Sequence, residues 1–291
     1  MATCIEEPAL NGGTQNANFK GDPFASRMDH KKVARINHDI NNLNLQEVKL
    51  RLQHRGSDAQ GSVEVLRKRL KNLMVPINKL DNRSQMQYYV VIDFEATCEE
   101  EKNNNYPHEI IEFPALLIDT KKREIVDQFH MYCKPEVNPT LSEFCTKLTG
   151  ISQEHVDSAE PFGVVVSKFH DWLLSHKLVG NKRKTNFAFV TDGPSDFSKF
   201  FIGNCKLANV HLPPYCRKYI NIQRAFMAHY RCKKPSLNGM LEHLALKFEG
   251  RPHAGIDDAK NIARILLVLI SEQAVLLPNE RYSASGNVYH I

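Results

Sequence analysis

The chain of 291 residues is 42% hydrophobic, which is enough for one globular domain of about 200 residues and a smaller module. Its formal charge of +5 is mildly basic and points only weakly to a polyanionic partner. The seven cysteines include no C-x-x-C pair, so neither a zinc ribbon nor a secreted disulfide framework is indicated, and reduced thiols in a cytosolic or nuclear protein are expected. No apolar stretch is long enough for a membrane span, and no secretory signal is recognisable.

The first quarter of the chain predicts a small helical module behind a disordered arm. Residues 1–36 are rich in Asn, Gly and Asp and poor in large apolar side chains, which is typical of disorder. Over residues 37–75, apolar side chains recur at three- and four-residue spacings around a Gly-containing turn, which predicts two short amphipathic helices. Residues 76–86 are interpreted as a linker.

The second of these helices carries a basic face, formed by Arg67, Lys68, Arg69 and Lys71. Such a face is expected to meet the phosphates of RNA, with salt-dependent affinity and without reading bases. A second short basic run, at residues 182–184, is interpreted as a solvated loop.

The rest of the chain alternates strands and helices. Strands are expected at 87–96, 110–118, 125–133 and 185–191, and helices at 140–148, 159–176, 194–204, 221–230, 236–248 and 256–275. This order predicts an α/β domain over 87–275, with a mixed central sheet flanked by helices. Pro114 argues slightly against a central position for its strand, because proline cannot donate to the ladder. Residues 276–291 are polar and are expected to form a flexible tail.

Two acids end the first predicted strand. Asp93 and Glu95 are one residue apart, so on a strand their side chains point to the same side. Uncompensated carboxylates are expensive to bury, whereas paired carboxylates are suitable ligands for hard divalent cations. A solvated strand end is the alternative, and this short motif alone does not decide between the two.

Further acids follow the later elements. Asp192 stands at the tip of the strand at 185–191 and is predicted as a metal ligand, because active sites of open α/β sheets gather at strand ends. Asp196 is assigned a structural role in the first turn of the next helix. Asp258 is predicted as a ligand and His253 as a mobile general base, since an imidazole pKa of about 6.5 allows proton uptake near neutral pH. A helix cap is the alternative for this pair.

The ordered set Asp93, Glu95, Asp192, His253 and Asp258 resembles the DEDDh group of 3′-to-5′ exonucleases. The resemblance extends from about residue 87 to 272, includes the segments 109–115, 148–151 and 251–265, and implies a ribonuclease-H-like fold. The preceding module resembles a SAP domain. Together the two are similar to the histone-mRNA stem-loop exonuclease family, which is also associated with small interfering RNA turnover and ribosomal RNA 3′-end trimming.

This resemblance implies an Mg²⁺-dependent 3′-to-5′ exoribonuclease that releases nucleoside 5′-monophosphates. Two Mg²⁺ ions, or Mn²⁺ as the substitute, would be held by the four acids, with His253 as the base. The terminal nucleotide would lie against Phe94, Ala96, Thr97, Leu148, Thr149 and His253. The implied partners are RNA with a stem-loop or short 3′ overhang and a stem-loop-binding protein or the ribosome, and the implied residence is cytoplasm and nucleus, including the nucleolus. Ser195 stands where many relatives have an aromatic residue, which leaves substrate placement near that loop open.

Two other functions remain alternatives. A DNA 3′ exonuclease is compatible with a SAP-like module, because such modules also bind DNA. A catalytically silent RNA-binding adaptor would have no need for an intact acid set, and all five positions are filled here. Digestion of matched RNA and DNA separates the first alternative, and binding without cleavage would identify the second.

Overall fold

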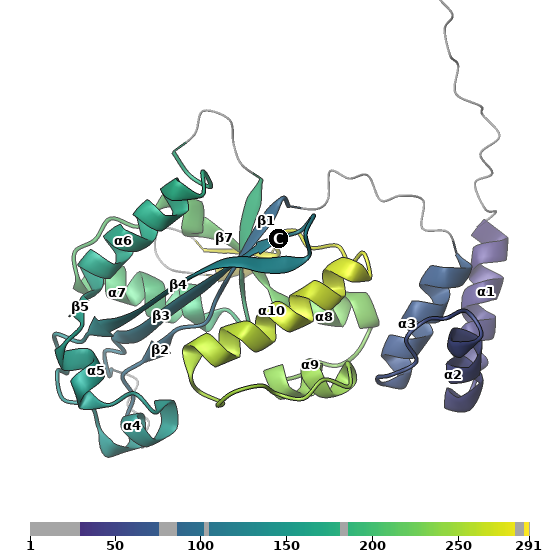
Figure 1. Ribbon diagram of the computed structural model, residues 1–291, viewed down its shortest axis with the longest axis horizontal. Helices are drawn as coiled ribbons and strands as arrows, with labels where there is room; N and C mark the ends of the chain where they lie inside the picture. Colours follow the sequence, from purple (N-terminus) through teal and green to yellow (C-terminus); the bar gives the residue numbers. More distant parts are fainter. Residues whose placement is uncertain (1–29, 76–85, 102–104, 181–185, 283–287, 291) are drawn as a thin grey trace, which may run out of the picture.

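The computed structural model describes residues 30–75, 86–101, 105–180, 186–282 and 288–290 (Figure 1). The first of these ranges forms a three-helix module, with helices α1 (His30–Asn42), α2 (Leu45–Gln53) and α3 (Val63–Met74). The disordered arm predicted for residues 1–36 was wrong for residues 30–36, which belong to α1. Residues 1–29 of that arm and 76–85 of the predicted linker lie outside the described residues.

The helical module needs all three helices to cover its leucines. Its buried cluster contains Ile40, Leu43, Val48, Leu52, Leu66 and Leu70. Asn44 forms a capping box with Glu47 at the start of α2, and the Ser62 hydroxyl accepts from the Val65 amide at the start of α3. The two-helix prediction missed α1 because its apolar residues are sparse, yet Ile40 is buried against the other two helices.

The α/β domain is built on one mixed sheet, which confirms the predicted fold class. Its strands are β1 (Tyr88–Ile92), β2 (Glu95–Ala96), β3 (Ile110–Asp119), β4 (Glu124–Lys134), β5 (Glu160–Pro161), β6 (Phe187–Thr191), β7 (Lys218–Asn221), β8 (Glu280–Tyr282) and β9 (Val288–His290). They are ordered β5-β4-β3-β1-β6-β7-β8-β9, with β2 beside β3. Strand β1 pairs antiparallel with β3 and parallel with β6, so its C-terminal end meets that of β6 at one edge of the sheet.

Helices cover both faces of this sheet. They are α4 (Glu143–Thr149), α5 (Gln153–Asp157), α6 (Phe162–Ser175), α7 (Ile202–Leu207), α8 (Ile222–Tyr230), α9 (Leu237–His243) and α10 (Gly255–Ser271), with a π-helical segment, η2 (Asp196–Phe201), before α7 and a 3-10 turn, η3 (Pro214–Arg217), before β7. Tyr89 and Val91 of β1 pack with α8, α9 and α10. Val90 and Ile92 alternate to the other face and pack with α6 and α7. Among the described residues, none of these helices is long and apolar enough to cross a membrane.

Two expectations about the sheet need correction. Pro114 lies in β3, an interior strand, opposite His130 of β4. It is tolerated because β1 pairs only as far as Ala115 and β2 resumes the ladder at Glu112, so no amide is needed between them. The flexible tail predicted for 276–291 was wrong for residues 280–282 and 288–290, which extend the sheet as β8 and β9.

The helical module contacts the α/β domain through α3. Val65 is buried in the same cluster as the residues of α8, α9 and α10. The Ser62 amide donates to the His243 carbonyl at 2.7 Å, and Figure 1 places α3 on the side of the module that faces α8 and α10. The two parts are therefore packed together and not merely tethered.

Candidate active site

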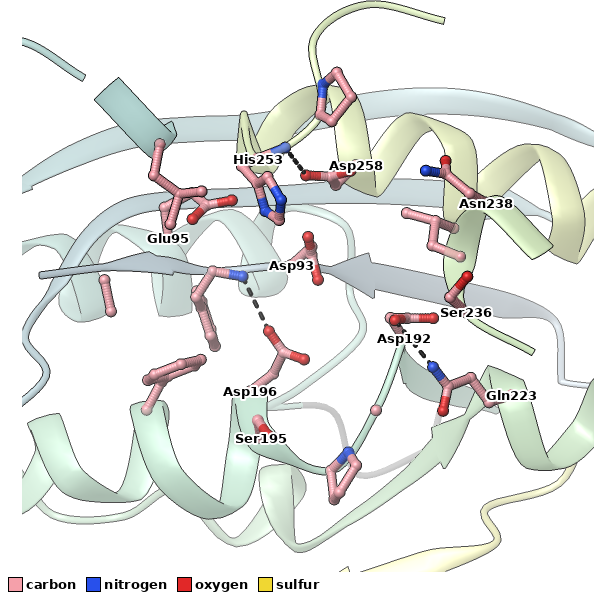
Figure 2. A pocket seen from close by; sticks show the side chains of 18 of the residues that line it. Asp93, Glu95, Asp192, Ser195, Asp196, Gln223, Ser236, Asn238, His253 and Asp258 are labelled. Carbon is pink, nitrogen blue, oxygen red and sulfur yellow. Dashed lines mark hydrogen bonds between the residues drawn. The ribbon is translucent and has the colours of Figure 1, made fainter. Parts of the chain in front are cut away.

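Five carboxylates from three stretches of the chain line one cavity of about 620 Å³: Asp93, Glu95, Asp192, Asp196 and Asp258. Figure 2 shows them arranged around a common space, with Asp93 near its centre. Asp93 directly follows β1 and Asp192 directly follows β6, so the parallel pairing of these strands brings the two together. Both acids lie at strand ends, as the sequence argument expected, and metal binding by Asp192 stays a prediction.

Burial and mutual repulsion raise the pKa values of these acids. Burial raises the pKa of Asp93 well above its usual range, and the carboxylates of Asp196, Asp258, Glu95 and Asp192 add to it in that order. Burial and then the Asp258 carboxylate raise the pKa of Glu95 to about 9. Burial is also the main cause that raises the pKa of Asp192 to about 6, of Asp196 to about 7 and of Asp258 to about 6. The cluster is therefore costly to ionise as it stands.

A divalent cation fits this cluster. The ligand atoms of Glu95, His253 and Asp258 lie within 4.8 Å of one another. Oδ1 of Asp192 is buried and has no hydrogen-bond partner among the described residues. Carboxylate oxygens are the ligands that Mg²⁺ and Mn²⁺ prefer, and a bound cation would offset the repulsion between them. The donor set thus suits a hard cation.

Asp196 lies in the cavity, although sequence reasoning gave it a structural role. Its Oδ1 accepts a hydrogen bond from the Phe94 amide at 3.0 Å, as Figure 2 shows, and it leads the carboxylates that raise the pKa of Asp93. Asp192 lies further along the cavity, where its Oδ2 accepts from Gln223 Nε2 at 3.2 Å. The burial that Asp196 shares with Phe197 and Phe201 of η2 is a tertiary feature that the local sequence does not show.

His253 stands beside Asp258 at the approach to α10. Its amide donates to Asp258 Oδ2 at 2.8 Å, and its φ of 61° is in the left-handed region that non-glycine residues seldom adopt. The imidazole is exposed and lines the cavity. The structure therefore places an exposed histidine next to the acids, and its role as a mobile base stays a prediction.

The start of α10 is held against the sheet by Glu112, which sequence reasoning missed. Its Oε2 accepts from the Gly255 amide at 2.9 Å, and its Oε1 accepts from Ile256 at 3.3 Å and contacts His130 Nε2 at 2.8 Å. A Cβ at Gly255 would lie 2.7 Å from the Asp93 carbonyl oxygen, so only glycine allows this approach. Glu112 thus satisfies free amides of the first helical turn and fixes Asp258 relative to Asp93.

The predicted nucleotide-contacting residues divide into two groups. Phe94, Ala96 and Leu148 line the cavity. Thr97 and Thr149 do not: both are buried, and their hydroxyls bond within the protein. Their prediction as lining residues was wrong, because each hydroxyl stabilises the turn that carries a lining neighbour. Ser195, which stands where the resemblance leads one to expect an aromatic residue, also lines the cavity, together with His108, Phe200, Gln223, Asn238 and Phe248, none of which was predicted.

The four basic residues of α3 have different surroundings. Arg69 is bound within the protein by Asp58 and Glu272, and its side chain is only 11% exposed. Arg67 donates to the Leu43 carbonyl at 2.8 Å, and Lys71 donates to Asn41 Oδ1 at 2.6 Å. The expectation that all four side chains face solvent was therefore wrong for Arg69, whose guanidinium bonds to Asp58 and Glu272. RNA docking by Arg67, Lys68 and Lys71 stays a prediction.

A mixed sheet that presents clustered acids and a histidine at its strand ends defines the class of ribonuclease-H-like, divalent-metal-dependent nucleases. Residues 90–266 match the family RNase_T, described as Exonuclease. The chain is 39% identical over 279 residues to 3′-5′ exoribonuclease 1 of Homo sapiens, which covers 93% of this chain and 77% of that protein. The chain therefore belongs to the exonuclease family, in its branch of 3′-5′ exoribonucleases.

Two solved structures agree with this assignment. The nuclease domain of 3′hExo, described as a DEDDh family member bound to rAMP, is 42% identical, with a TM-score of 0.65 over 68% of this chain and 98% of that chain. The structure titled "3'-end specific recognition of histone mRNA stem-loop by 3'-exonuclease" is 41% identical, with a TM-score of 0.67 over 71% and 91%. The ribonuclease-H-like fold and the DEDDh relationship expected from the sequence are thus confirmed.

Proposed function

We propose that this protein trims the 3′ ends of structured RNA by Mg²⁺-dependent hydrolysis and releases nucleoside 5′-monophosphates. The observation that carries the proposal is the convergence of five buried or partly buried carboxylates and His253 on one open cavity. The relative whose title names the histone mRNA stem-loop supports RNA of that type as substrate. Small interfering RNA and the 3′ end of ribosomal RNA belong to the same proposal.

Asp93, Glu95, Asp196 and Asp258 would hold the metal, with Asp192 at the rim of the same cavity. This set differs from the one expected from the sequence because Asp196 takes the place of Asp192. Asp196 is the more deeply buried of the two, and its carboxylate raises the pKa of Asp93 more than that of Asp192 does. Two bound Mg²⁺ ions would lower the pKa of the attacking water and stabilise charge on the departing 3′ oxygen.

The chain's own groups supply the remaining steps. The His253 imidazole takes the proton from the attacking water, and its exposure leaves it free to approach and withdraw. The hydrogen bond from the His253 amide to Asp258 fixes the position of the histidine backbone relative to the Asp258 carboxylate. Phe94 and Leu148 offer apolar surface to the terminal base, while His108 and Asn238 add polar contacts at the cavity wall. No covalent enzyme intermediate is needed.

Digestion of a 5′-labelled RNA stem-loop with a short 3′ tail tests the proposal. Stepwise 3′ shortening is expected with Mg²⁺. It should be absent in EDTA and absent with the Asp93→Asn variant. Asp171→Asn is the matched control, because Asp171 is an exposed acid of α6 outside the cavity. Tight binding without shortening would favour the adaptor, and equal digestion of the matching DNA would overturn the RNA preference.

Partners and residence are proposed on the resemblance alone. Association with a stem-loop-binding protein or the ribosome, and residence in cytoplasm and nucleus including the nucleolus, can be tested by imaging a fluorescent fusion and by co-sedimentation with ribosomes.

A further inference from the structure

A second cavity, of about 250 Å³, lies where the helical module meets the α/β domain. Its lining includes Asn37 and Asn41 of α1 and Lys68 and Lys71 of α3. Arg231, the residue that directly follows α8, lines it from the α/β domain. Neither part of the protein forms this cavity alone. It is separate from the acid-lined cavity, with which it shares no lining residue.

The junction cavity concentrates positive charge. Burial lowers the pKa of Lys68, and the Arg231 guanidinium lowers it further. Burial also lowers the pKa of Lys71, with contributions from Arg231, Arg67 and Lys68 in that order. Glu64 is the one carboxylate among the described lining residues. The side chains of Lys68 and Arg231 have no hydrogen-bond or ion-pair partner among the residues that the structure describes.

Glu272, whose carboxylate raises the pKa of Lys68 against the two lowering effects, is already engaged. Glu272 accepts from Arg69 Nε at 2.7 Å, from Tyr230 Oη at 2.9 Å and contacts His229 Nε2 at 3.1 Å. These bonds join α3 to α8 and to the end of α10, so they hold the two walls of the junction cavity in a fixed relation. The cavity is thus a preformed site with three cationic side chains, three amide side chains and one carboxylate, that of Glu64, so positive charge is in excess.

We propose that the junction cavity binds one phosphodiester of the RNA strand, upstream of the 3′ end that enters the acid-lined cavity. Lysine, arginine and asparagine donors around one small volume match the oxygens of a phosphate. The walls are polar apart from Val75 and Tyr230, so a phosphate on a polar backbone fits better than a lipid headgroup with its apolar chains. This inference rests on the proposed function, since it assumes that RNA is the substrate.

The inference makes binding depend on RNA length. An RNA that occupies both cavities gains the phosphate contact, whereas a short single strand reaches only the acid-lined cavity. We expect wild-type protein to bind the stem-loop with its 3′ tail more tightly than a short strand of the tail sequence. The dependence on salt should also be steeper for the longer RNA, because more cations are displaced from it.

The test is the full chain with Lys68→Ala and Arg231→Ala together, measured by fluorescence anisotropy in EDTA over a range of salt concentrations. Stem-loop binding should weaken about tenfold or more, and the slope of log affinity against log salt should fall by about one. Cleavage of the short strand with Mg²⁺ should be unchanged. The control is Arg51→Ala with Lys206→Ala, which removes the same charge from exposed positions of α2 and α7 outside the cavity.

If the control pair weakens stem-loop binding equally, the phosphate site is overturned and the effect is only general electrostatic attraction of RNA. Unchanged stem-loop binding by the Lys68 and Arg231 variant would overturn it as well. A second variant, Lys68→Arg with Arg231→Lys, keeps the charge and should keep the salt slope, so a loss caused by misfolding is separated from a loss of phosphate binding. Failure of wild-type protein to shorten any RNA would instead count against the proposed function.

Discussion

Arg69 of α3 donates from Nε to Glu272 at 2.7 Å, across the boundary between the helical module and the α/β domain. Both side chains are about one-tenth exposed. Arg69 also bonds Asp58 within its own module, so this guanidinium ties the two parts together. Removing one member of such a pair leaves the other charged and unpaired in a poorly solvated place.

Arg69→Ala is expected to detach the helical module from the α/β domain. The loss should reach about 3 kcal/mol of docking free energy, because Glu272 stays buried without its main cation. Limited proteolysis after residue 75 and hydrogen exchange of α3 would report it. Arg51→Ala, on the exposed face of α2, should leave both unchanged. Faster exchange in the acid-lined cavity, with α3 unaffected, would contradict this assignment.

The same contact should weaken in acid. Burial alone would raise the pKa of Glu272, but the bonds from His229 and Arg69 outweigh it and hold the pKa below its ordinary value of 4.5. The stabilising contribution is therefore complete above pH 4.5 and is lost as pH falls through the lowered value. Hydrogen exchange of α3 at pH 3 and pH 6 would check it, with Glu272→Gln as the variant in which the difference should shrink.

The two acids that follow β6 should differ in importance. Asp196→Asn is expected to slow cleavage on the order of 10²–10³-fold, because this carboxylate lies beside Asp93. The amide can still accept from Phe94, so the melting temperature should change little. Asp192→Asn should have the smaller effect. Single-turnover cleavage at saturating Mg²⁺ measures both, and a larger loss for Asp192→Asn would restore the assignment made from the sequence.

Metal should stabilise the protein more at high pH than at low pH. Without cation, the raised pKa values of Asp192, Asp196 and Asp258 keep protons on the folded protein between the ordinary value of 3.8 and about 6 to 7. The free energy of unfolding therefore falls as pH rises through this window. Mg²⁺ at a hundred times its Kd should restore about 2.7 kcal/mol near pH 8 and much less near pH 5.

Urea unfolding in EDTA and in Mg²⁺ at the two pH values measures this difference. Asp93→Asn with Asp258→Asn should abolish the response to Mg²⁺. An equal response at pH 5 and pH 8 would show that the cation does not bind the ionised carboxylates.

Glu112 should act on catalysis through the placement of α10. Glu112→Ala leaves the Gly255 and Ile256 amides without an acceptor, which should cost about 3 kcal/mol of folding free energy. It should also lower kcat by about 10- to 100-fold with little change in KM, since Asp258 and His253 shift together. His130→Gln, which leaves both amide bonds intact, should affect kcat far less. Equal kcat values for wild type and Glu112→Ala, measured below the melting temperature, would exclude this positioning role.

Part of the fold and site was predictable because the local pattern of apolar and acidic residues matches their burial and position in the folded protein. The run before Asp93 is apolar at every position since β1 is buried on both faces, and its acids follow where the sheet ends. Strands β8 and β9 were missed because they are short and polar and are stabilised by pairing with β7. Residues 30–36 of α1 were missed because that helix has one buried residue, Ile40, and depends on its packing against α2 and α3.

The errors in the site have a different physical origin. Asp196 was assigned a structural role because acids are favoured in the first turn of a helix. Its bond from the Phe94 amide, about 100 residues away in the chain, is visible only in the folded protein. Arg69 belongs to a basic run that suggests a solvent-facing surface. Its partner, Glu272, is about 200 residues away in the chain, and such pairs leave no trace in local spacing.

The acids of the site are spread along the chain, and α10 supplies the last of them. When residues up to 250 have emerged from the ribosome during synthesis, Asp93, Glu95 and Asp196 are outside it, but His253 and Asp258 are not. Without α10, Glu112 also has no helix to hold, and the face of the sheet that α8 and α9 cover lacks its longest helix. We expect the nascent chain to be inert toward the messenger and ribosomal RNA around it, so that translation itself delays the moment when a new nuclease can cut.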